Sequence, residues 1–518
     1  MYGSILPAIL VSISLAAGQA GARHFEIAFG GGRAAHVVVP AGPARAHTEG
    51  KPAAPEKPNI VFILLDDVGY NVFRAYGGVA FETPNFDRLA AEGMVFTQCH
   101  SRAMCAPTRQ AFTTGKHLGR GHVNELRPTI AQLLKGAGYA TCISGKWMMG
   151  RMEPWQRGFE EGAVQVNGFR FWSPHVVVYG SGGYLKEHNL PLLEGRKSDY
   201  DWPINGTQPG AVKLEGDYGP DVACRFACDF IERHAGQPFF VYYAMKLGHA
   251  PIVPTPLTPA GPKEKAVIRE FAIRDYPDFS GLGDKKYEAD NVRYADRLIG
   301  QVVAKLEELG LRDNTLVVVT SDNGPGVHGE VAAGESLLPG HKGGALEAAT
   351  RVPCVLRWPA VVKPGSRCDD LVDFTDFLPT FVEVAGAALP EGEVFDGRSF
   401  LPRLRGERGD PREWIYFHRS AHPVHWKRTL AKIVEYEEPK PWICRYLRGT
   451  RYKLYGDGRF YDLESDLGEL HPIMPGTGTA DAERARQAYQ QLLDRFAREA
   501  KDMPPEPKYN YKSTLPVR

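Results

Sequence analysis

The sequence predicts an α/β fold in which a large, mostly parallel sheet is sandwiched by helices. Apolar runs of strand length recur along the chain, and segments with helical spacing of apolar residues separate them. This alternation implies a sheet that is covered by helices on both faces. Polar residues follow four of the predicted strands, and ligands of such sheets gather beyond the carboxyl ends of the strands. The fold class therefore also predicts where a functional site lies.

The composition is that of a globular protein with a sizeable core. The chain has 518 residues, 43% hydrophobic and 24% charged, enough for one large domain and a smaller one. A formal net charge of +1 gives no electrostatic reason to expect nucleic acid or an anionic membrane as a partner. Eight cysteines are too few for a disulfide framework. Cys224 and Cys228, on a predicted helix, are expected to be core thiols rather than metal ligands.

The N-terminal residues predict export. Residues 5–17 form an apolar run that ends in small residues, with Ala20 and Ala22 as cleavage positions, so we assign residues 1–22 to a signal peptide. The run is too short to span a bilayer, and no other stretch has the character of a membrane span. Residues 23–57 are rich in Gly, Ala and Pro and are expected to form a flexible leader. The mature protein is therefore expected in the periplasm or outside the cell.

The predicted strands and helices alternate through the body of the chain. Residues 59–65 form a continuous apolar run with carboxylates at its end, which is typical of a buried parallel strand. Further strands are expected at residues 139–144, 239–245, 316–322 and 352–358. Helices are expected at residues 85–93, 128–138, 221–234, 287–309 and 374–385.

Two acidic pairs follow buried strands and predict a metal site. Asp66 and Asp67 follow the first strand, and Asp322 and Asn323 follow a later one. Their hard oxygen ligands favour calcium or magnesium over zinc. Each pair alone also suits a turn, because Asp and Asn tolerate left-handed backbone. Together, at one sheet edge, the pairs are better explained by a cation that offsets their mutual repulsion.

The stretch MCAPTRQAFTTGKH predicts an anion site around a cysteine. Pro107 fixes its own φ and favours an extended Ala106, so Cys105 is expected on a turn that leads into a helix beginning near Arg109. The positive end of that helix and the donor fork of Arg109 favour an anion or a developing oxyanion. The alternative is a buried structural thiol. A cysteine phosphatase loop is excluded, because its arginine would stand six residues after the cysteine, where this chain has Ala111.

The run from Cys105 to Arg109 resembles the formylglycine motif of the type I (formylglycine-dependent) sulfatase family in the alkaline phosphatase superfamily. Thr108 stands where the family most often has Ser and keeps the hydroxyl. In that family a separate formylglycine-generating enzyme oxidises the cysteine, and the hydrated aldehyde attacks sulfur. The resemblance implies that the residues that bind the metal are Asp66, Asp67, Asp322, Asn323 and the converted Cys105.

Three further motifs match the family's anion-binding residues. Lys146 lies in GKW, His249 in GHAP and Lys342 in KGGALEAATRVP, where two alanines replace family glycines. The resemblance implies that Lys146, Lys342 and Arg109 stabilise the charge of the sulfuryl group. It also implies that His249 protonates the leaving alcohol. The implied catalytic set is Cys105, Arg109, Lys146, His249 and Lys342.

One position departs from the family. Sulfatases commonly have a histidine two residues after the lysine of GKW, and this chain has Met148 there. Methionine neither accepts a proton as a base nor donates a hydrogen bond. The histidines that are candidates to replace it are His122, His328 and His341.

The resemblance also implies the domain organisation. A large mixed, mostly parallel sheet sandwiched by helices is expected in a catalytic domain at residues 58–404, and a smaller C-terminal domain at residues 405–518. Residues 451–469 resemble the closing hairpin of that domain's short antiparallel sheet, and residues 480–501 its packed helix. The irregular, aromatic-rich residues 159–217 are interpreted as a binding loop or as ordinary packing. The three histidines His418, His422 and His425 are expected at the substrate edge or in packing rather than at a zinc ion.

The resemblance implies a sulfatase that hydrolyses an organic sulfate ester, with a sulfated small molecule or glycan as substrate and Ca²⁺ or Mg²⁺ as the metal. One alternative is a phosphonate or phosphate ester hydrolase of the same superfamily. Met148 allows a second alternative, a non-catalytic relative that binds sulfated glycans.

Overall fold

The computed structural model describes residues 57–79, 81–117, 128–149, 154–165, 218–250, 252–259, 261, 285–326, 342–420 and 443–499, and the strands at 22–29, 33–40, 176–179, 210–212, 332–333 and 336–337. The chain divides into two units, Met1–Ala54 and Pro55–Arg518. In the first unit β1 (Ala22–Phe29) and β2 (Arg33–Pro40) pair antiparallel. The sequence analysis expected no regular structure there, although the apolar residues of HFEIAF alternate as in a strand.

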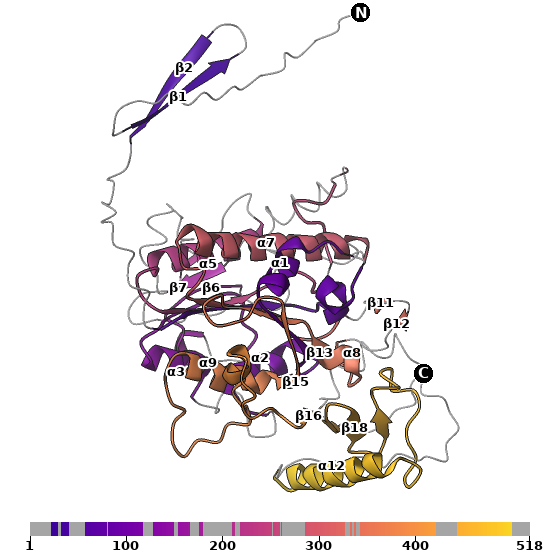
Figure 1. Cartoon of the computed structure of the whole chain (residues 1–518). Coiled ribbons are helices and arrows are strands. Elements are labelled where there is room, and N and C mark those ends of the chain that lie inside the picture. The colour runs from indigo at the N-terminus through magenta and orange to yellow at the C-terminus, as the bar shows by residue number, and fades with distance from the viewer. Residues whose placement is uncertain are drawn as a thin grey trace, which may run out of the picture. The chain divides into compact units, whose positions relative to one another are not determined.

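The second unit is built on an 11-stranded sheet (Figure 1). Five adjacent parallel strands form its centre: β10 (Thr315–Ser321), β3 (Asn59–Leu65), β9 (Phe239–Ala244), β5 (Ala140–Lys146) and β6 (Glu161–Gln165). Beyond β6 lie β7 (Val176–Tyr179) and β8 (Gly210–Val212), and beyond β10 lie β14 (Cys354–Arg357), β4 (Met94–His100), β13 (Arg351–Val352) and β15 (Ser366–Asp373). The predicted α/β fold is confirmed.

Helices cover both faces of this sheet, as the alternation predicts (Figure 1). One face carries α1 (Pro84–Glu92), α5 (Gly219–Arg233) and α7 (Glu288–Glu308), and the other carries α2 (Cys105–Thr114), α3 (Ile130–Gly136) and α9 (Phe377–Val384). Strand β3 shows why its run of apolar residues is continuous. Val61, Ile63 and Leu65 pack on the first face, and the residues between them pack on the second.

A smaller antiparallel sheet follows in the sequence. Its strands, in spatial order, are β16 (Ile415–Ser420), β17 (Ile443–Arg448), β18 (Tyr452–Tyr455) and β19 (Phe460–Asp462). Helix α12 (Ala480–Glu499) packs on one face through an apolar cluster that includes Leu447 and Phe496. On the other face Tyr446 and Tyr455 pack in a cluster that contains Ala103 and Ala349 of the large domain. The antiparallel sheet and packed helix are confirmed, while the domain boundary after residue 404 stays a prediction.

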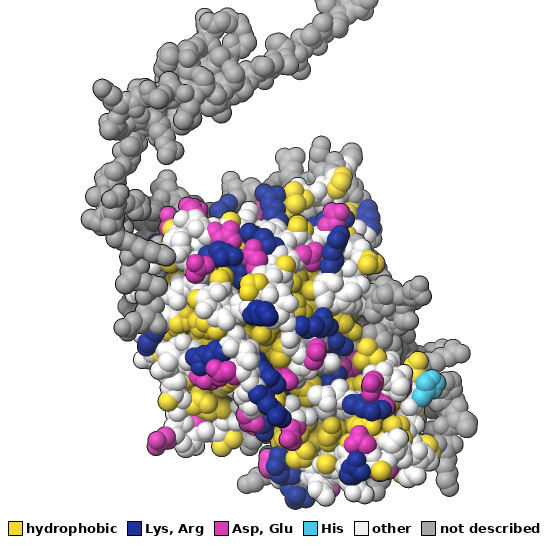
Figure 2. Space-filling view, in the orientation of Figure 1, with side chains coloured by type: hydrophobic (Ala, Val, Ile, Leu, Met, Phe, Trp, Pro, Cys, Tyr) yellow, Lys and Arg dark blue, Asp and Glu magenta, His cyan; other side chains and the backbone are white. Residues whose placement is uncertain are grey.

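The remaining elements are short. They are η1 (Tyr70–Val72), η2 (Arg74–Tyr76), η4 (Pro154–Arg157), η5 (Lys285–Tyr287), η6 (Phe374–Asp376), α8 (Glu347–Thr350), α10 (Leu401–Leu404), β11 (Ala332–Ala333) and β12 (Ser336–Leu337). Figure 2 shows one face of the molecule, on which basic and acidic side chains are interspersed, as the net charge of +1 leads one to expect. Among the described helices, none has both the length and the apolar character needed to cross a bilayer.

Candidate active site

The sheet brings the predicted strand-end residues to one edge. Strands β3 and β10 pair in parallel up to Leu65 and Ser321, so Asp66 and Asp322 follow at the same level. Lys146 is the last residue of β5, one strand beyond β9. The chain that leaves β9 runs over this edge, because the backbone NH of Met245 donates to the carbonyl of Leu64 at 2.8 Å. The carboxyl ends of four neighbouring strands therefore frame the candidate site.

Helix α2 begins one turn earlier than the sequence predicts. Cys105 is its first residue and Met104 its extended N-cap, with φ −149° and ψ 147°. The prediction of an extended Ala106 and a helix beginning near Arg109 is therefore wrong. Pro107 lies within the first turn, where a missing backbone NH costs no hydrogen bond. As a result Cys105 lies directly at the positive end of the helix.

Two glycines allow the backbones of neighbouring segments to approach closely at the carboxyl ends of the strands. Gly145 has φ +98°, and a Cβ atom there would lie 2.0 Å from the carbonyl oxygen of Ala244. Gly248 has φ +103°, and a Cβ atom there would lie 2.4 Å from the carbonyl oxygen of Asp66. Only glycine fits these positions, which immediately precede Lys146 and His249. The local sequence thus explains how both side chains reach the same edge.

Each acidic residue of the site lies beside a cation. Lys146 Nζ lies 2.5 Å from Asp66 Oδ2, and Lys342 Nζ lies 2.7 Å from Asp67 Oδ1. The Arg109 guanidinium lies 2.8 Å from Asp322 Oδ2 and also donates to the backbone carbonyl of Lys146 at 2.8 Å. Arg109, Lys146, Asp66 and Asp322 are all completely buried. The site is a dense array of opposite charges. The Arg109 guanidinium is paired with Asp322 and is not left open to an anion from outside.

Cys105 lies within this array. Its sulfur donates to Asp66 Oδ1 at 3.4 Å, and Asn323 Oδ1 lies 3.5 Å from the same sulfur. The Asn323 amide nitrogen donates to Asp67 Oδ1 at 2.8 Å, and the Asp67 backbone NH donates to Asp322 Oδ1 at 3.3 Å. The sequence thus identified five residues that the fold places in mutual contact.

The donor set suits a hard divalent cation. Ligand atoms of Asp66, Asp67, Cys105 and His249 all lie within 4.8 Å of one another, and Asn323 adds an amide oxygen beside Cys105. Carboxylate and amide oxygens are the ligands that calcium and magnesium prefer. The backbone of Asp67 is left-handed, with φ +63°, which costs energy outside glycine and is typical of functional sites.

The pKa shifts follow from burial and from these pairs. Burial raises the pKa of Asp66, but the surrounding cations, above all Lys146, outweigh this and hold it well below its usual range. Burial and the charge of Asp66 raise the pKa of Asp322 to about 6. Burial also raises the pKa of the Cys105 thiol to about 12, with neighbouring carboxylates adding to the shift. An unmodified thiol at this position stays protonated at neutral pH and is a poor nucleophile.

His249 lies at the more open side of the site. It is half-buried, and its Nδ1 is 2.5 Å from the carbonyl oxygen of Ala250, so Nδ1 is the donor. Burial, with the nearby charge of Lys246, lowers the pKa of His249 well below its usual value. The neutral ring, with its proton on Nδ1, is therefore the favoured form at pH 7.

The sequence analysis missed two residues of this site. Lys246 lies two residues after β9 and is only 2% exposed, and burial together with the charge of Lys146 lowers its pKa well below the usual range. The rule that identified Lys146, a polar residue at the end of a buried strand, would also have found Lys246. The hydroxyl of Tyr242 lies 3.3 Å from Arg109, and no sequence signal separated it from an ordinary core residue of β9.

Several predicted residues lie outside the described part of the chain. These are His122, His328, His341, His422 and His425, and most of residues 159–217. Met148 is described: it follows β5, has φ +48° and is 40% exposed. His418 lies in β16 and is buried, with its ring stacked on Tyr416 at a centroid distance of 6.4 Å. Cys224 is buried, Cys228 is half-buried, and neither forms a disulfide.

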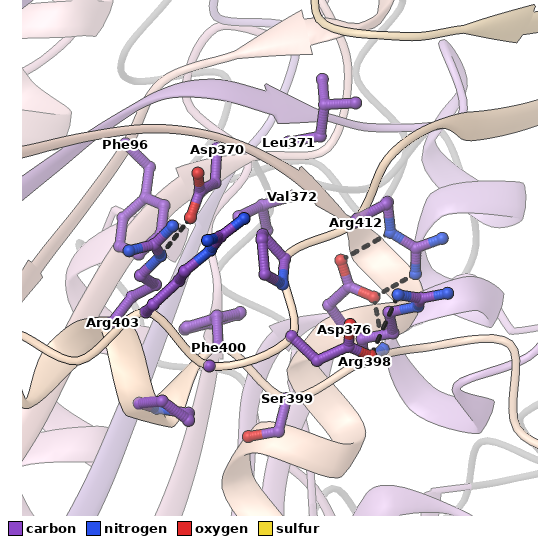
Figure 3. Close-up of a pocket in the computed structure, with 15 residues that line it drawn as sticks. Phe96, Asp370, Leu371, Val372, Asp376, Arg398, Ser399, Phe400, Arg403 and Arg412 are labelled. Atoms are coloured by element: carbon purple, nitrogen blue, oxygen red, sulfur yellow. Dashed lines mark hydrogen bonds and ion pairs between the residues drawn. The ribbon is translucent and has the colours of Figure 1, made fainter.

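A separate cavity lies beside β15 and η6 (Figure 3). Its arginines are held by carboxylates, since Arg412 contacts Asp376 and Arg403 contacts Asp370. Arg398, also labelled in Figure 3, lies 3.0 Å from the Asp410 carboxylate. These paired charges hold together the segments that line the cavity.

Solved structures share this fold. Ps i-CgsB superimposes with a TM-score of 0.64 and 25% sequence identity, covering 86% of this chain and 94% of that one. The PsFucS1 sulfatase from Pseudoalteromonas sp. superimposes with a TM-score of 0.60 and 21% identity, covering 86% and 92% of the two chains. These similarities confirm the fold class of the chain.

Sequence comparison gives the family itself. Residues 58–387 match the family described as Sulfatase, and residues 342–497 match one described as N-sulphoglucosamine sulphohydrolase, C-terminal. Canine N-acetylgalactosamine-6-sulfatase is 30% identical over 71% of this chain and 70% of that protein. The N-acetylgalactosamine-6-O-sulfatase of Bacteroides thetaiotaomicron is 29% identical over 81% and 90%, and mouse steryl-sulfatase is 28% identical over 85% and 81%. This chain belongs to the sulfatase family.

Proposed function

We propose that this sulfatase hydrolyses a sulfate ester of a carbohydrate, with a formylglycine made from Cys105 and a divalent cation, calcium or alternatively magnesium. The observation that carries the proposal is the place of Cys105 at the N-terminus of α2, in contact with Asp66 and Asn323. When present, the converted residue supplies a nucleophilic hydroxyl and the cation supplies Lewis acidity. The formylglycine-generating enzyme is then a partner during maturation.

The chain's own residues have distinct tasks in this proposal. The residues that hold the cation are Asp66, Asp67, Asp322 and Asn323, with the converted Cys105. Arg109 keeps Asp322 in place through their 2.8 Å ion pair. Lys146 and Lys342, now beside Asp66 and Asp67, also lie where they can attract the sulfate oxygens. Positive charge that is fixed in a buried site before the reaction stabilises charge that develops on the sulfuryl group.

His249 is proposed to protonate the leaving alcohol oxygen. A ring nitrogen of this half-buried residue lies within 4.8 Å of the Cys105 sulfur, and Nδ1 donates to the carbonyl of Ala250. To protonate that oxygen the ring must first take up a second proton, at Nε2, against the burial that lowers its pKa. Lys342, which lies beside Asp67, is proposed to act with His249 on the same oxygen.

A carbohydrate substrate is favoured by the relatives. Two of the similar proteins are N-acetylgalactosamine-6-sulfatases, and Ps i-CgsB has been solved in complex with k-i-k-neocarrahexaose at a TM-score of 0.63 to this chain. The steryl-sulfatase relative represents the competing substrate class, a sulfated small molecule without a sugar. We also propose that the apolar run at residues 5–17 directs export, to the periplasm or beyond the cell.

The test begins with protein from a host that contains the modifying enzyme. Peptide mass across Cys105 should show conversion of the thiol to the aldehyde. The converted protein should then hydrolyse an aryl sulfate much faster than the matched aryl phosphate, and release sulfate from sulfated oligosaccharides. Preference for the phosphate would favour the phosphate or phosphonate ester hydrolase. Binding of sulfated glycans without any hydrolysis by converted protein would contradict the proposal and favour a non-catalytic relative.

A further inference from the structure

A loop at residues 342–347 connects the active site to the small C-terminal sheet. At its start, Lys342 Nζ lies 2.7 Å from Asp67 Oδ1, and the Lys342 backbone NH donates to the carbonyl of Pro325 at 2.8 Å. The NH of Gly343 donates to the carbonyl of Ala103 at 2.7 Å, two residues before Cys105. The first half of the loop therefore touches both the metal-binding residues and the segment that carries the cysteine.

The second half of the loop is held by the C-terminal sheet. The carbonyl of Ala345 accepts from Lys453 Nζ at 2.7 Å, and the Tyr455 hydroxyl oxygen lies 3.1 Å from it. The backbone NH of Glu347 donates to Glu469 Oε1 at 3.0 Å. Lys453 donates to the same oxygen at 2.7 Å, and the Tyr455 hydroxyl donates to Oε2 at 2.5 Å. The Glu469 carboxylate thus connects three groups that fix the loop.

This arrangement is costly for folding. Lys453 is fully buried and Glu469 is 3% exposed, and charges removed from water cost more than apolar residues of the same size. Glu469 also has a left-handed backbone, with φ +57°. Energetic cost of this kind persists where the surrounding structure fixes a geometry that function requires. The cluster therefore calls for a role beyond holding two domains together.

The loop itself explains why it needs an external anchor. Gly343 and Gly344 follow Lys342 directly, and Gly343 has φ +83°. Glycine leaves the backbone many conformations, so two in succession would let the lysine move relative to Asp67. Hydrogen bonds to Ala345 and Glu347, just beyond the glycines, remove this freedom. The anchor acts at the positions where it most restricts Lys342.

We propose that Glu469 is a positioning residue of the sulfatase reaction. With Lys453 and Tyr455 it fixes the loop backbone, and through the loop it holds Lys342 at the active site. The inference rests on the proposed function, in which Lys342 acts on the sulfate group. The C-terminal sheet then supports catalysis directly, although none of these three residues touches the reacting atoms.

A double-mutant cycle tests this role. Glu469→Gln should lower kcat/KM for an aryl sulfate by roughly 10- to 100-fold, mostly through kcat, because displacement of a catalytic group by about 1 Å can have an effect of that size. In a Lys342→Ala background the same change should lower kcat/KM by less than about 3-fold, since the group it positions is gone. Asp296→Asn is the matched control: Asp296 is also 3% exposed, but it contacts the start of α1 instead of this loop. It should leave both kinetic constants nearly unchanged.

Equal losses of kcat/KM in the two backgrounds would overturn the proposal, because they would show a general structural effect. If Glu469→Gln does not fold, the same cycle with Tyr455→Phe removes one anchoring hydroxyl while keeping the ring. Hydrogen exchange gives a readout that is independent of activity: the amides of residues 343–347 should exchange faster in the variant than in the wild type. Unchanged exchange would also contradict the positioning role, whereas inactivity of the converted wild-type protein would contradict the proposed function alone.

Discussion

The sulfur of Cys105 donates a hydrogen bond to Asp66 Oδ1 at 3.4 Å, and both side chains are buried. The contact places the residue that we propose becomes formylglycine against a residue that we propose binds the metal.

Cys105→Ala should abolish sulfate ester hydrolysis and leave the fold intact. The side chain lost is small and lies at a helix start, so the large sheet keeps its packing. Turnover and circular dichroism of the purified variant check both parts. Cys228→Ala, at a half-buried cysteine on α5, is the control and should retain activity. Comparable turnover by Cys105→Ala and the wild type would rule out the formylglycine mechanism.

Removal of the metal should lower both activity and melting temperature. A chelator should inactivate the enzyme, and calcium or magnesium should restore it. At a metal concentration of 100 times Kd, binding to the folded state adds about 2.7 kcal/mol to the free energy of unfolding. Asp322→Asn keeps the size of the side chain but removes a charge that faces the site, so its melting temperature should respond far less to the metal. An equal response in the variant would show that Asp322 is not a ligand.

Met148→His should leave kcat unchanged or raise it. Met148 follows Lys146 closely, is 40% exposed, and has a left-handed backbone that histidine adopts more readily than methionine. The substitution therefore restores the residue that is common in the family without filling a packed core. Steady-state kinetics with an aryl sulfate measure the effect. A large loss of kcat would show that the apolar side chain itself is required.

The stability of the protein should fall in mild acid, partly because of His418. Burial lowers the pKa of His418 to about 4, with the charges of Arg445 and Arg102 adding to the shift. The unfolded chain takes up a proton below about pH 6.5, whereas the folded protein takes it up only below about pH 4. The free energy of unfolding therefore drops by about 1.4 kcal/mol per pH unit as the pH falls through this window.

His418→Phe should remove that contribution. Within the described part of the chain, neither ring nitrogen of His418 has a hydrogen-bond partner, so phenylalanine loses no such bond. Chemical denaturation of both proteins at pH 7 and at pH 5 measures the difference. Identical pH dependence in the two proteins would show that His418 does not titrate in this range.

Much of the fold follows from apolar runs that are buried on both sides. The bounds of strand β3 were predicted correctly. All seven of its residues are buried, and all except the first, Asn59, are apolar. Strand β4 was missed, since its sequence MVFTQCH contains polar residues that find partners only in the folded protein. Thr97 donates to Asp369 at 2.7 Å, and Arg448 donates to Gln98 at 2.9 Å. Such contacts depend on residues hundreds of positions away, which local pattern cannot identify.

Some residues of the candidate site could likewise be predicted from local sequence, and others could not. The strand-end rule found Asp66, Asp322 and Lys146, because parallel strands must bring their carboxyl ends together. The same rule was not applied to Lys246, which lies where the rule predicts. Lys342 reaches Asp67 from a glycine-rich loop, and that loop contacts Glu469, which is 122 residues from Glu347 in the sequence. No spacing of residues in the sequence predicts the contact between Lys342 and Asp67.

Because Cys105 is buried in the folded protein, the proposed conversion to formylglycine has to take place before folding is complete. Only 4% of the residue is exposed, so a modifying enzyme has no access to it after folding. Asn323, which closes the site beside the sulfur, follows Cys105 by 218 residues. At a synthesis rate of roughly 5–20 residues per second, that interval lasts about 10 to 40 seconds. The cysteine is thus accessible during translation for a time that chain length determines, and slower elongation through residues 106–323 would increase the converted fraction.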